Sequence, residues 1–443
     1  MGTRTLACGI DYGTSNSAVA LAMDGNVAVV PPDPGVDNPS LPSVAYLHRA
    51  GRREAGGDAV REYFTHGHLR TLCQNCSLVS YGIETECRQF RKGGGCNDTR
   101  LVTGVKRDLS RLDFIATHSW ANDFELPDLV SIVLGRLRDA ASRRAGDEVR
   151  KVVLGHPVVF PGAAELQERS HQEALARLEE GARLAGFEDV AFFPEPAAAV
   201  IGEELPDGTF LSVDFGGGTF DAAVIEARGG AVEVRSLAGV AIGGTLFDEA
   251  LFETSVGERL GLDALPYWLF NDMRSLAGVH TLLSDAGLPG VIGRVGGEAA
   301  RVASAILFEG NAYSFYKSIE DAKIRLSTEP ETVLRFRRPG IDLSVKLRRS
   351  EFEAVIKPDL ERVEAVYMEA LERAGIAPDG VDYVLRTGGS SRLPAFIARL
   401  EEIFGRDKVR ERDAFTGVVR GLGVRARDIW QTRGRRDFRP GPP

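Results

Sequence analysis

Two segments, far apart along the chain, share one pattern of hydrophobic and polar positions. In each, a short apolar run leads into a turn of small and polar residues, and a second apolar run follows, over residues 5–22 and residues 210–226. Apolar runs bounded by Gly, Ser and Asp are typical of β-strands, so each segment predicts a strand, a tight turn and a second strand. Asp11 and Asp214 stand at the end of the first strand in the two copies. The repeat predicts two similarly built lobes that face each other across a cleft, because its period is too long for a solenoid.

Longer stretches with helical periodicity separate the predicted strands. Between the two copies, the pattern predicts a strand at residues 152–157, an amphipathic helix at about 162–185 and a short strand near 190–193. A further helix is expected to begin at Pro196, because the fixed φ of proline suits the first helical turn. After the second copy the pattern is mostly helical to about residue 327.

The C-terminal part of the chain predicts two strands, a long helix, a further strand and a last helix, at residues 332–337, 342–347, 350 onward, 383–386 and about 415–430. Ser350 and Glu353 have the spacing of a capping box at the start of the long helix. The residues from 433 onward are rich in Arg and Pro and predict a disordered tail. Strands that alternate with long helices predict an α/β fold class.

The length of 443 residues exceeds what a single hydrophobic core accommodates, so two lobes are expected. We expect lobe I at residues 1–205 and lobe II at residues 206–426, with the final helix of lobe II packing back on lobe I. Residues 427–443 are expected to form a tail. The apolar fraction of 43% and the charged fraction of 26% are ordinary for a soluble globular protein.

Charge and hydropathy narrow the possible partners. The formal net charge of −9 argues against nucleic acid, because proteins that bind its phosphate backbone normally carry a basic surplus. No run approaches the roughly 20 apolar residues that span a bilayer. Asp11 interrupts the N-terminal apolar positions too early for a signal peptide. We therefore expect a cytoplasmic protein that binds neither nucleic acid nor membrane.

Four of the five cysteines fall in one short segment, at Cys73, Cys76, Cys87 and Cys96. In a cytoplasmic protein such a cluster indicates metal or redox chemistry before disulfides. A Cys-x-x-Cys pair and two further thiolates could hold one tetrahedral Zn²⁺, although the eight residues between the second pair are a loose spacing for a zinc ribbon. An iron–sulfur cluster, a redox pair and unligated thiols remain alternatives.

The strongest candidate chemistry lies in three turns rich in Gly and hydroxyl residues, at residues 11–16, 214–219 and 387–392. Without bulky side chains, the backbone N–H groups of such turns can approach phosphate oxygens closely, and Ser or Thr hydroxyls add donors. Two turns from opposite lobes would hold a triphosphate from both sides. Asp11 and Asp214 would then hold Mg²⁺ through its water ligands, because magnesium gives up its hydration reluctantly.

Each of these turns alone also fits an ordinary β-hairpin, in which Gly and Asp are common. The three together favour a nucleotide site. Two familiar nucleotide motifs do not fit: residues 216–219 lack the Gly-Lys-Thr ending of a P-loop, and the glycine spacing of a dinucleotide fingerprint is missing.

Four motifs resemble those of the seventy-kilodalton heat-shock chaperones. Residues 9–17 resemble the family's first phosphate motif, residues 214–221 its second, residues 195–199 its connecting motif and residues 387–394 its adenosine motif. Their order and spacing match the family over roughly residues 5–426.

This resemblance implies an α/β protein with the actin-like ATPase fold, in which two similar lobes with ribonuclease-H-like sheets enclose a nucleotide cleft. The length and the pair Gly186-Phe187 resemble the short YegD-like branch of the family. We expect no peptide-binding domain after Trp430, and residues 66–100, which contain the four cysteines, look like an insertion into lobe I.

The resemblance also implies roles for single residues. Lys106 would position the attacking water, although by itself it fits a surface lysine equally well. The residues with implied catalytic roles are Lys106, Asp214, Glu195 and Thr219. The implied metal ligands are Asp11 and Asp214. The implied nucleotide contacts are Asp11, Gly13, Thr14, Ser15, Asn16, Gly216, Gly217, Gly218, Asp221, Gly243, Gly244, Glu320, Lys323, Ser327, Gly388, Gly389, Ser390, Arg392 and Asp413.

One position departs from the family pattern. Ile324 stands where the family has an arginine that stacks on the adenine, and the neighbouring Arg325 points elsewhere by about 100°. The resemblance therefore leaves the affinity for the base open.

The implied function is that of an ATP-binding and ATP-hydrolysing, chaperone-like switch, with ATP or ADP and Mg²⁺ bound and a protein client or co-chaperone as partner. Catalysis would consist mainly of positioning and charge neutralisation. The alternatives are a nucleotide-dependent actin-like filament protein, a sugar-kinase-like phosphotransferase and a sensor that binds ATP but hardly cleaves it.

Overall fold

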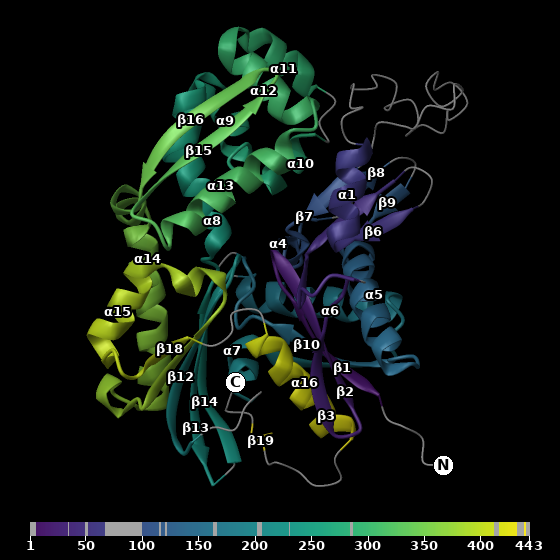
Figure 1. Ribbon diagram of the computed structural model, residues 1–443, viewed down its shortest axis with the longest axis vertical. Coiled ribbons are helices and arrows are strands. Elements are labelled where there is room, and N and C mark those ends of the chain that lie inside the picture. Colours follow the sequence, from purple (N-terminus) through teal and green to yellow (C-terminus); the bar gives the residue numbers. More distant parts are fainter. Residues whose placement is uncertain are drawn as a thin grey trace.

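The computed structural model describes residues 6–33, 35–48, 52–66, 100–114, 117–119, 122–162, 166–201, 206–229, 231–283, 287–411, 416–431 and 438–439. Two halves stand side by side, and each half has a central sheet below and a smaller subdomain above (Figure 1). We call the half that contains β1 lobe I and the half that contains β12 lobe II. The four clustered cysteines lie outside the described residues.

The central sheet of lobe I has the strand order β11-β10-β1-β2-β3, with β4 paired to β2. The first three strands of the chain form an antiparallel meander, and β10 and β11 extend the sheet in parallel beside β1. The bounds are β1 (Ala7–Tyr12), β2 (Asn16–Met23), β3 (Asn26–Val30), β4 (Ser40–Pro42), β10 (Lys151–His156) and β11 (Asp189–Pro194).

The central sheet of lobe II repeats this path, in the order β18-β17-β12-β13-β14-β19. Again an antiparallel meander comes first, and two parallel strands extend it. The bounds are β12 (Gly208–Phe215), β13 (Phe220–Arg228), β14 (Ala231–Val240), β17 (Tyr383–Thr387), β18 (Val409–Glu411) and β19 (Phe438–Arg439). The β1–β2 turn of lobe I and the β12–β13 turn of lobe II therefore occupy equivalent positions.

Two of these strands differ from the sequence-based expectation. β14 lies where the pattern predicts mostly helix, although the alternation from Val232 to Ser236 does have the period of a strand. β19 lies in the tail that was expected to be disordered, and its Phe438 pairs with Val232 of β14. For β19, the edge formed by β14 supplies the hydrogen-bond partners, which the local pattern of the tail does not reveal.

Helices cover both sheets and fill the space between them. In lobe I, α5 (Leu126–Ala145) and α6 (Gln167–Leu184) pack together on the outer side of the sheet, and in lobe II α14 (Arg349–Ala374) packs on β13 and β14. α7 (Glu195–Ile201) contacts β12 and β13 of lobe II, whereas α16 (Gly417–Trp430) contacts β1, β2 and β10 of lobe I. Each half thus ends in a helix that packs on the other half, and the two helices contact each other. Buried apolar side chains of both lobes merge there into one core, which includes Phe210 and Leu422.

In its described residues, the upper subdomain of lobe I has a three-stranded sheet (β6-β5-β7), the helix α1, a short helix at the cleft and a separate two-stranded hairpin. Its elements are β5 (Val44–Leu47), β6 (Arg53–Ala55), α1 (Gly56–His66), β7 (Arg100–Thr103), α4 (Val105–Asp108), β8 (Thr117–Ser119) and β9 (Asn122–Phe124).

The upper subdomain of lobe II is mainly helical and carries one exposed hairpin. Its elements are α8 (Gly244–Leu251), a π-helical segment (Phe252–Gly257), short 3₁₀ turns (Glu258–Leu260 and Leu262–Ala264), α9 (Tyr267–Asp272), α10 (Leu276–Leu282), α11 (Leu288–Val295), α12 (Gly297–Phe308), α13 (Ala312–Leu326), β15 (Glu331–Arg338) and β16 (Ile341–Arg348). Below it, 3₁₀ turns (Pro378–Gly380 and Gly389–Arg392) flank β17, and α15 (Pro394–Phe404) follows.

Two helix starts correct the sequence-based expectations. The predicted capping box at Ser350 is wrong, because α14 already begins at Arg349 and has no side-chain cap at Arg348. α7 begins at Glu195, one residue before the proline. Within the described residues, no helix combines the length and the apolar character needed to cross a membrane.

Candidate functional site

A cavity of about 640 Å³ lies between the two lobes. The turns that follow β1, β12 and β17 line it, together with α4, the start of α7, the start of α8 and one face of α13. These elements come from distant parts of the sequence, so the folding of lobe II and its packing against lobe I together bring them to one cavity.

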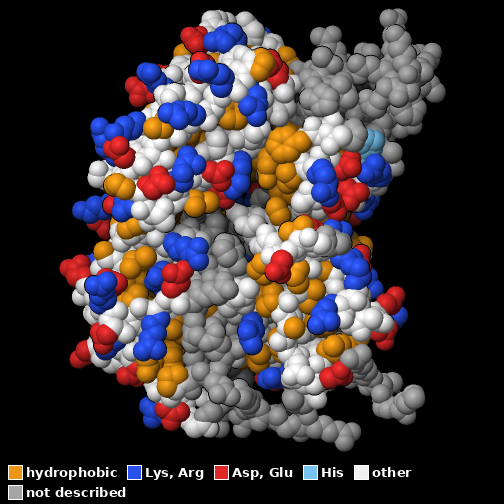
Figure 2. Space-filling model, in the orientation of Figure 1, with side chains coloured by type: hydrophobic (Ala, Val, Ile, Leu, Met, Phe, Trp, Pro, Cys, Tyr) orange, Lys and Arg blue, Asp and Glu red, His pale blue; other side chains and the backbone are white. Residues whose placement is uncertain are grey.

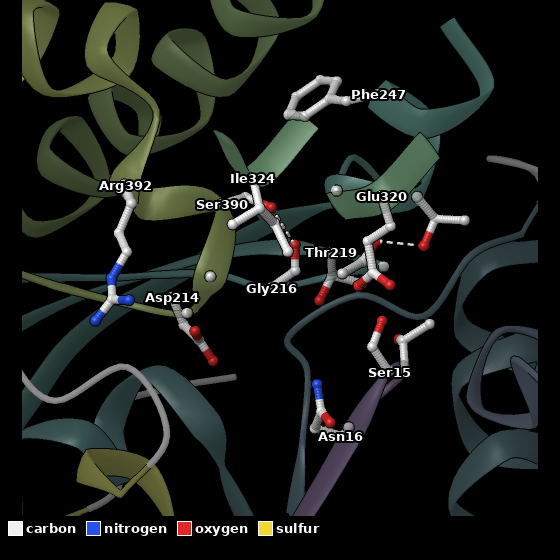
Figure 3. A pocket seen from close by; sticks show the side chains of 18 of the residues that line it. Ser15, Asn16, Asp214, Gly216, Thr219, Phe247, Glu320, Ile324, Ser390 and Arg392 are labelled. Carbon is white, nitrogen blue, oxygen red and sulfur yellow. Dashed lines mark hydrogen bonds between the residues drawn. The ribbon is translucent and has the colours of Figure 1, made fainter. Parts of the chain in front are cut away.

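The first two turns face each other closely across this cavity. A Cβ atom added to Gly218 would lie 2.5 Å from the hydroxyl oxygen of Thr14, and one added to Gly217 would lie 2.8 Å from that of Ser15. Figure 3 shows Ser15 and Asn16 pointing from lobe I toward Thr219 on the opposite turn. Glycine at 217 and 218 permits this approach, because a Cβ atom there would displace the hydroxyls of Thr14 and Ser15 from their present positions.

Hydrogen bonds from neighbouring elements hold the backbone of the second turn. The Gly216 carbonyl accepts hydrogen bonds from the Gly244 amide at 3.0 Å and from the Ser390 hydroxyl at 2.8 Å, the latter drawn in Figure 3. The Gly217 carbonyl accepts two from Thr245, from its amide and from its hydroxyl, each at 2.8 Å. Both carbonyls thus point toward lobe II elements behind the turn.

The third turn packs against the second. Gly388 has a φ of +81°, a conformation that favours glycine, and a Cβ there would collide with the Phe215 carbonyl. The Thr387 hydroxyl donates a hydrogen bond to the Asp214 carboxylate at 3.1 Å. The third turn therefore supports the position of Asp214.

Three carboxylates, those of Asp11, Glu195 and Asp214, meet at the floor of the cavity around Lys106, and a fourth, that of Asp221, lies just behind them. Lys106 and Glu195 are almost fully buried and form an ion pair with 2.6 Å between Nζ and Oε1. Burial alone would lower the pKa of Lys106, but the nearby carboxylates of Glu195 and Asp11 outweigh it and raise that pKa. Lys106 therefore remains a cation.

The pKa values of three of these carboxyl groups are raised. Burial, and then the charge of Glu195, raise the pKa of Asp11 to about 8 and that of Asp214 to about 6. For the same two reasons the pKa of Asp221 is raised well above its usual value. Such a site favours a cation, because an added positive charge would relieve both the desolvation and the mutual repulsion.

Asp221 stands behind the second turn and joins the two lobes. One of its oxygens accepts a hydrogen bond from the Thr219 hydroxyl at 2.8 Å, and the other accepts one from the Val158 amide of lobe I at 2.7 Å. It lies next to Asp214 in the β12–β13 register but does not itself line the cavity.

The opposite end of the cavity is more apolar. Figure 3 shows Ile324 and Arg392 on one side of the pocket, away from Ser15 and Asn16. Ile324 keeps 54% of its surface exposed although it lines the cavity, and Leu393, Ile397 and Val418 extend the apolar lining. Arg392 donates a hydrogen bond to Glu411 at 2.8 Å.

Lys323, on α13, reaches the start of α8. Its ammonium donates hydrogen bonds at 2.8 Å to the Gly244 carbonyl and to the Asp248 carboxylate. Burial, opposed by Lys323, raises the pKa of Asp248 to about 6. One turn earlier on α13, Glu320 also lines the cavity and pairs with Lys317.

Most residues selected from the sequence lie at this cavity. They are Asp11, Gly13, Thr14, Ser15, Asn16, Lys106, Glu195, Asp214, Gly216, Gly217, Gly218, Thr219, Gly244, Glu320, Lys323, Ser327, Gly388, Gly389, Ser390 and Arg392. Asp221 and Gly243 stand behind the lining, and Asp413 lies outside the described residues.

Three residues at the site were not selected from the sequence: Thr245, Asp248 and Glu411. Thr387 lies in the selected third turn, but its contact with Asp214 was not predicted. Thr245 and Asp248 follow the selected glycine pair directly on α8, and Asp248 comes one helical turn after Gly244, so their helical spacing was an available signal. Glu411 gives no such signal, because its place opposite Arg392 follows only from the β17–β18 pairing.

The upper subdomains also touch each other above the cavity. The Tyr63 hydroxyl of α1 donates a hydrogen bond to the Gly310 carbonyl of lobe II at 3.0 Å, and the rings of Tyr63 and Phe64 both contact the ring of Tyr313 edge-on. On the face shown in Figure 2, hydrophobic side chains gather where the two upper subdomains meet. We call Tyr63, Phe64 and Tyr313 the aromatic clasp.

Comparison with known proteins decides the family. The model of the family described as Hsp70 protein matches residues 7–260 and 313–435, which is most of the chain. The chain belongs to the Hsp70 family. The predicted resemblance and the predicted actin-like ATPase fold are therefore confirmed.

Among curated Hsp70 relatives, the protein named chaperone protein DnaK from Thermus thermophilus is 28% identical over 311 residues, which cover 68% of this chain and 43% of the relative. The protein of the same name from Cenarchaeum symbiosum is 25% identical over 431 residues, which cover 94% of this chain and 53% of the relative. The chain thus spans about half the length of the Hsp70 relatives that it matches. The unmatched segment between residues 260 and 313 contains α9 to α12 of the upper lobe II subdomain.

Proposed function

We propose that this chain binds ATP with Mg²⁺ in the cavity between its lobes and hydrolyses it slowly. The observation that carries the proposal is the pair of glycine-rich turns, one from each lobe, that face each other at contact distance above a buried group of four carboxylates and one lysine. Opposed turns of this kind offer backbone and hydroxyl donors to phosphate oxygens from two sides.

The residues at the floor suit a magnesium ion. Carboxylate oxygens are the protein ligands that Mg²⁺ prefers, and Asp11 and Asp214 lie at the two strand ends next to the phosphate turns. We assign these two as the groups that hold the ion through its waters. The ion would neutralise charge on the phosphates during transfer.

The protein's own part in the reaction is positioning. Lys106, held by Glu195, would orient the attacking water and stabilise charge on the phosphoryl group. Thr14 and Thr219 would contact the phosphate from opposite lobes. Because Asp221 joins Thr219 to Val158 of lobe I, a contact that draws on the Thr219 hydroxyl would also change the bond between the lobes. Nucleotide state would then be read as lobe closure.

The other end of the cavity would hold the nucleoside. Glu320 and Lys323 would contact the ribose, and Ile324 and Arg392 would flank the base with the support of Ser327, Gly388, Gly389 and Ser390. Ile324 offers only apolar contact, so we expect base affinity to come from burial against Ile324, Leu393 and Ile397 rather than from a second cation.

Calorimetry with ATP, in the presence and absence of Mg²⁺, tests binding directly, and a single-turnover assay without an acceptor tests hydrolysis. Tight binding without phosphate release would identify a sensor instead. Release of phosphate only when a sugar is added would identify a phosphotransferase, and sedimentation after ATP addition would identify a filament protein. The family match favours neither of the last two.

We further propose a protein client or a co-chaperone as the partner that reads lobe closure, in the cytoplasm. The assignment is carried by the relatives' printed function as chaperones, and it is tested by nucleotide-dependent capture of an unfolded model protein.

The cysteine segment stays a separate prediction. A site for Zn²⁺ at Cys73, Cys76, Cys87 and Cys96 requires stoichiometric metal in the purified protein that is lost in a Cys73→Ser, Cys76→Ser variant. Iron and sulfide in place of zinc would indicate a cluster, and a metal-free protein with four titratable thiols would indicate unligated cysteines.

A further inference from the structure

The start of α8 packs directly on the peptide group between Gly217 and Gly218. A Cβ atom added to Gly243 would lie 2.5 Å from the carbonyl carbon of Gly217 and 2.6 Å from the amide nitrogen of Gly218. The helix therefore presses on the face of this peptide plane, and its first residues reach the carbonyl oxygen.

Thr245, the second residue of α8, makes two hydrogen bonds to that oxygen. Its amide and its hydroxyl both donate to the Gly217 carbonyl at 2.8 Å. In a trans peptide the carbonyl and the following N–H point in opposite directions. The N–H of Gly218 therefore points away from Thr245, the donor to the Gly217 carbonyl, and Gly218 itself lines the cavity.

Two of the three glycine N–H groups of this turn have no hydrogen-bond acceptor within the described part of the chain. Gly216 donates its N–H to the Thr219 carbonyl and so closes the turn. For Gly217 and Gly218, the described residues provide no acceptor for the backbone N–H, and both glycines line the cavity. Donors without an acceptor at a cavity wall are suited to an anion.

We propose that Thr245 is a positioning residue for phosphate: its hydroxyl fixes the Gly217–Gly218 peptide so that the Gly218 N–H is presented to a phosphate oxygen of the nucleotide. The inference rests on the proposed function and adds a residue that acts through the backbone rather than by touching the ligand. Free rotation of this peptide would let the carbonyl oxygen, which repels phosphate, turn into the cavity. The threonine hydroxyl holds it back.

The test compares Thr245→Val with Thr245→Ser. Valine keeps the shape and the amide bond but removes the hydroxyl, whereas serine keeps the hydroxyl. Thr254→Val is the matched control, because Thr254 also donates its hydroxyl to a carbonyl, that of Ala250 at 2.8 Å, but lies on the surface away from the cavity. Circular dichroism and thermal unfolding establish that each variant is folded, and Thr245→Ala serves as a second hydroxyl-free variant.

The measurements are titrations with magnesium–ADP and with adenosine. We expect Thr245→Val to weaken magnesium–ADP binding about fivefold, which corresponds to about 1 kcal/mol for one hydrogen bond. Adenosine binding is expected to stay unchanged, because adenosine carries no phosphate. Thr245→Ser and Thr254→Val are expected to bind both ligands as the unchanged protein does.

Two results overturn the inference while leaving the proposed function intact. One is magnesium–ADP binding by Thr245→Val and Thr245→Ala that equals that of the unchanged protein. The other is an equal loss for magnesium–ADP and adenosine, which would show that Thr245 supports the cavity as a whole. If the unchanged protein binds no magnesium–ADP, the proposed function itself is wrong, so the two failures can be told apart.

Discussion

The buried ion pair of Lys106 is the sharpest place to test the proposed chemistry. Its Nζ lies 2.6 Å from Glu195 Oε1, and the two side chains are only 8% and 5% exposed. Replacing Lys106 with methionine keeps a side chain of similar length and removes the one positive charge from among four carboxylates. Because electrostatic donors of this kind contribute about 100-fold to 1,000-fold to catalysis, we expect single-turnover ATP hydrolysis to fall by about that factor. Binding of magnesium–ATP should be nearly unchanged.

The same substitution should cost stability. Glu195 would be left buried without its cation, and breaking a buried pair by removing one partner costs about 3–5 kcal/mol. A Lys106→Met, Glu195→Gln double variant removes both charges and should recover much of this loss but none of the activity. Thermal unfolding and hydrolysis measured on both variants therefore separate the two roles.

Lys346→Met is the control. Lys346 pairs with Glu331 at the same distance of 2.6 Å, but the two side chains are 50% and 53% exposed. An exposed pair contributes at most about 1 kcal/mol, so this variant should unfold and hydrolyse ATP almost as the unchanged protein does. Full hydrolysis by Lys106→Met, or an equal loss in Lys346→Met, would refute the reasoning.

Three further expectations follow from the geometry. Gly218→Val should abolish magnesium–ATP binding without unfolding the protein, because the valine side chain would enter the opposite turn. The control Gly135→Ala should bind normally, because its added Cβ meets nothing within 4 Å. Calorimetric titration with magnesium–ATP measures both affinities. Loosening the aromatic clasp with Tyr63→Phe and Tyr313→Ala should speed the release of a fluorescent ADP analogue severalfold, and an unchanged release rate would show that the clasp does not restrain opening. Burial raises the pKa of Asp11 to about 8, so the folded state without metal binds a proton more tightly than the unfolded chain does. Its thermal stability should therefore fall as the pH rises from about 5 to 8.5, and Mg²⁺ should offset that fall. A thermal stability that rises with pH over this range in the protein but not in Asp11→Asn would contradict this expectation.

The repeated strand–turn–strand units could be predicted from the sequence. Their apolar runs and glycine-rich turns are local features, and a strand ends where Asp11 or Asp214 meets Gly and hydroxyl residues regardless of the rest of the chain. The same locality made most of the cavity lining predictable, because the selected residues sit inside or directly beside these turns. The family motifs extended the prediction to Glu320 and Lys323 on α13, which no local pattern links to the turns.

The contacts of single side chains within the site depend on tertiary packing. The carboxylate group around Lys106 forms because α4, α7 and the two meanders meet at one point, and sequence spacing alone cannot place Lys106 against Glu195. Glu411 entered the site for the same reason, since its partner Arg392 lies on another element. β19 was missed because this two-residue edge strand is stabilised by its pairing with β14 more than by its own pattern, whereas β14 does carry a strand-like alternation at residues 232–236. Local chemistry thus fixed the turns, and the packing of one lobe against the other turned them into a site.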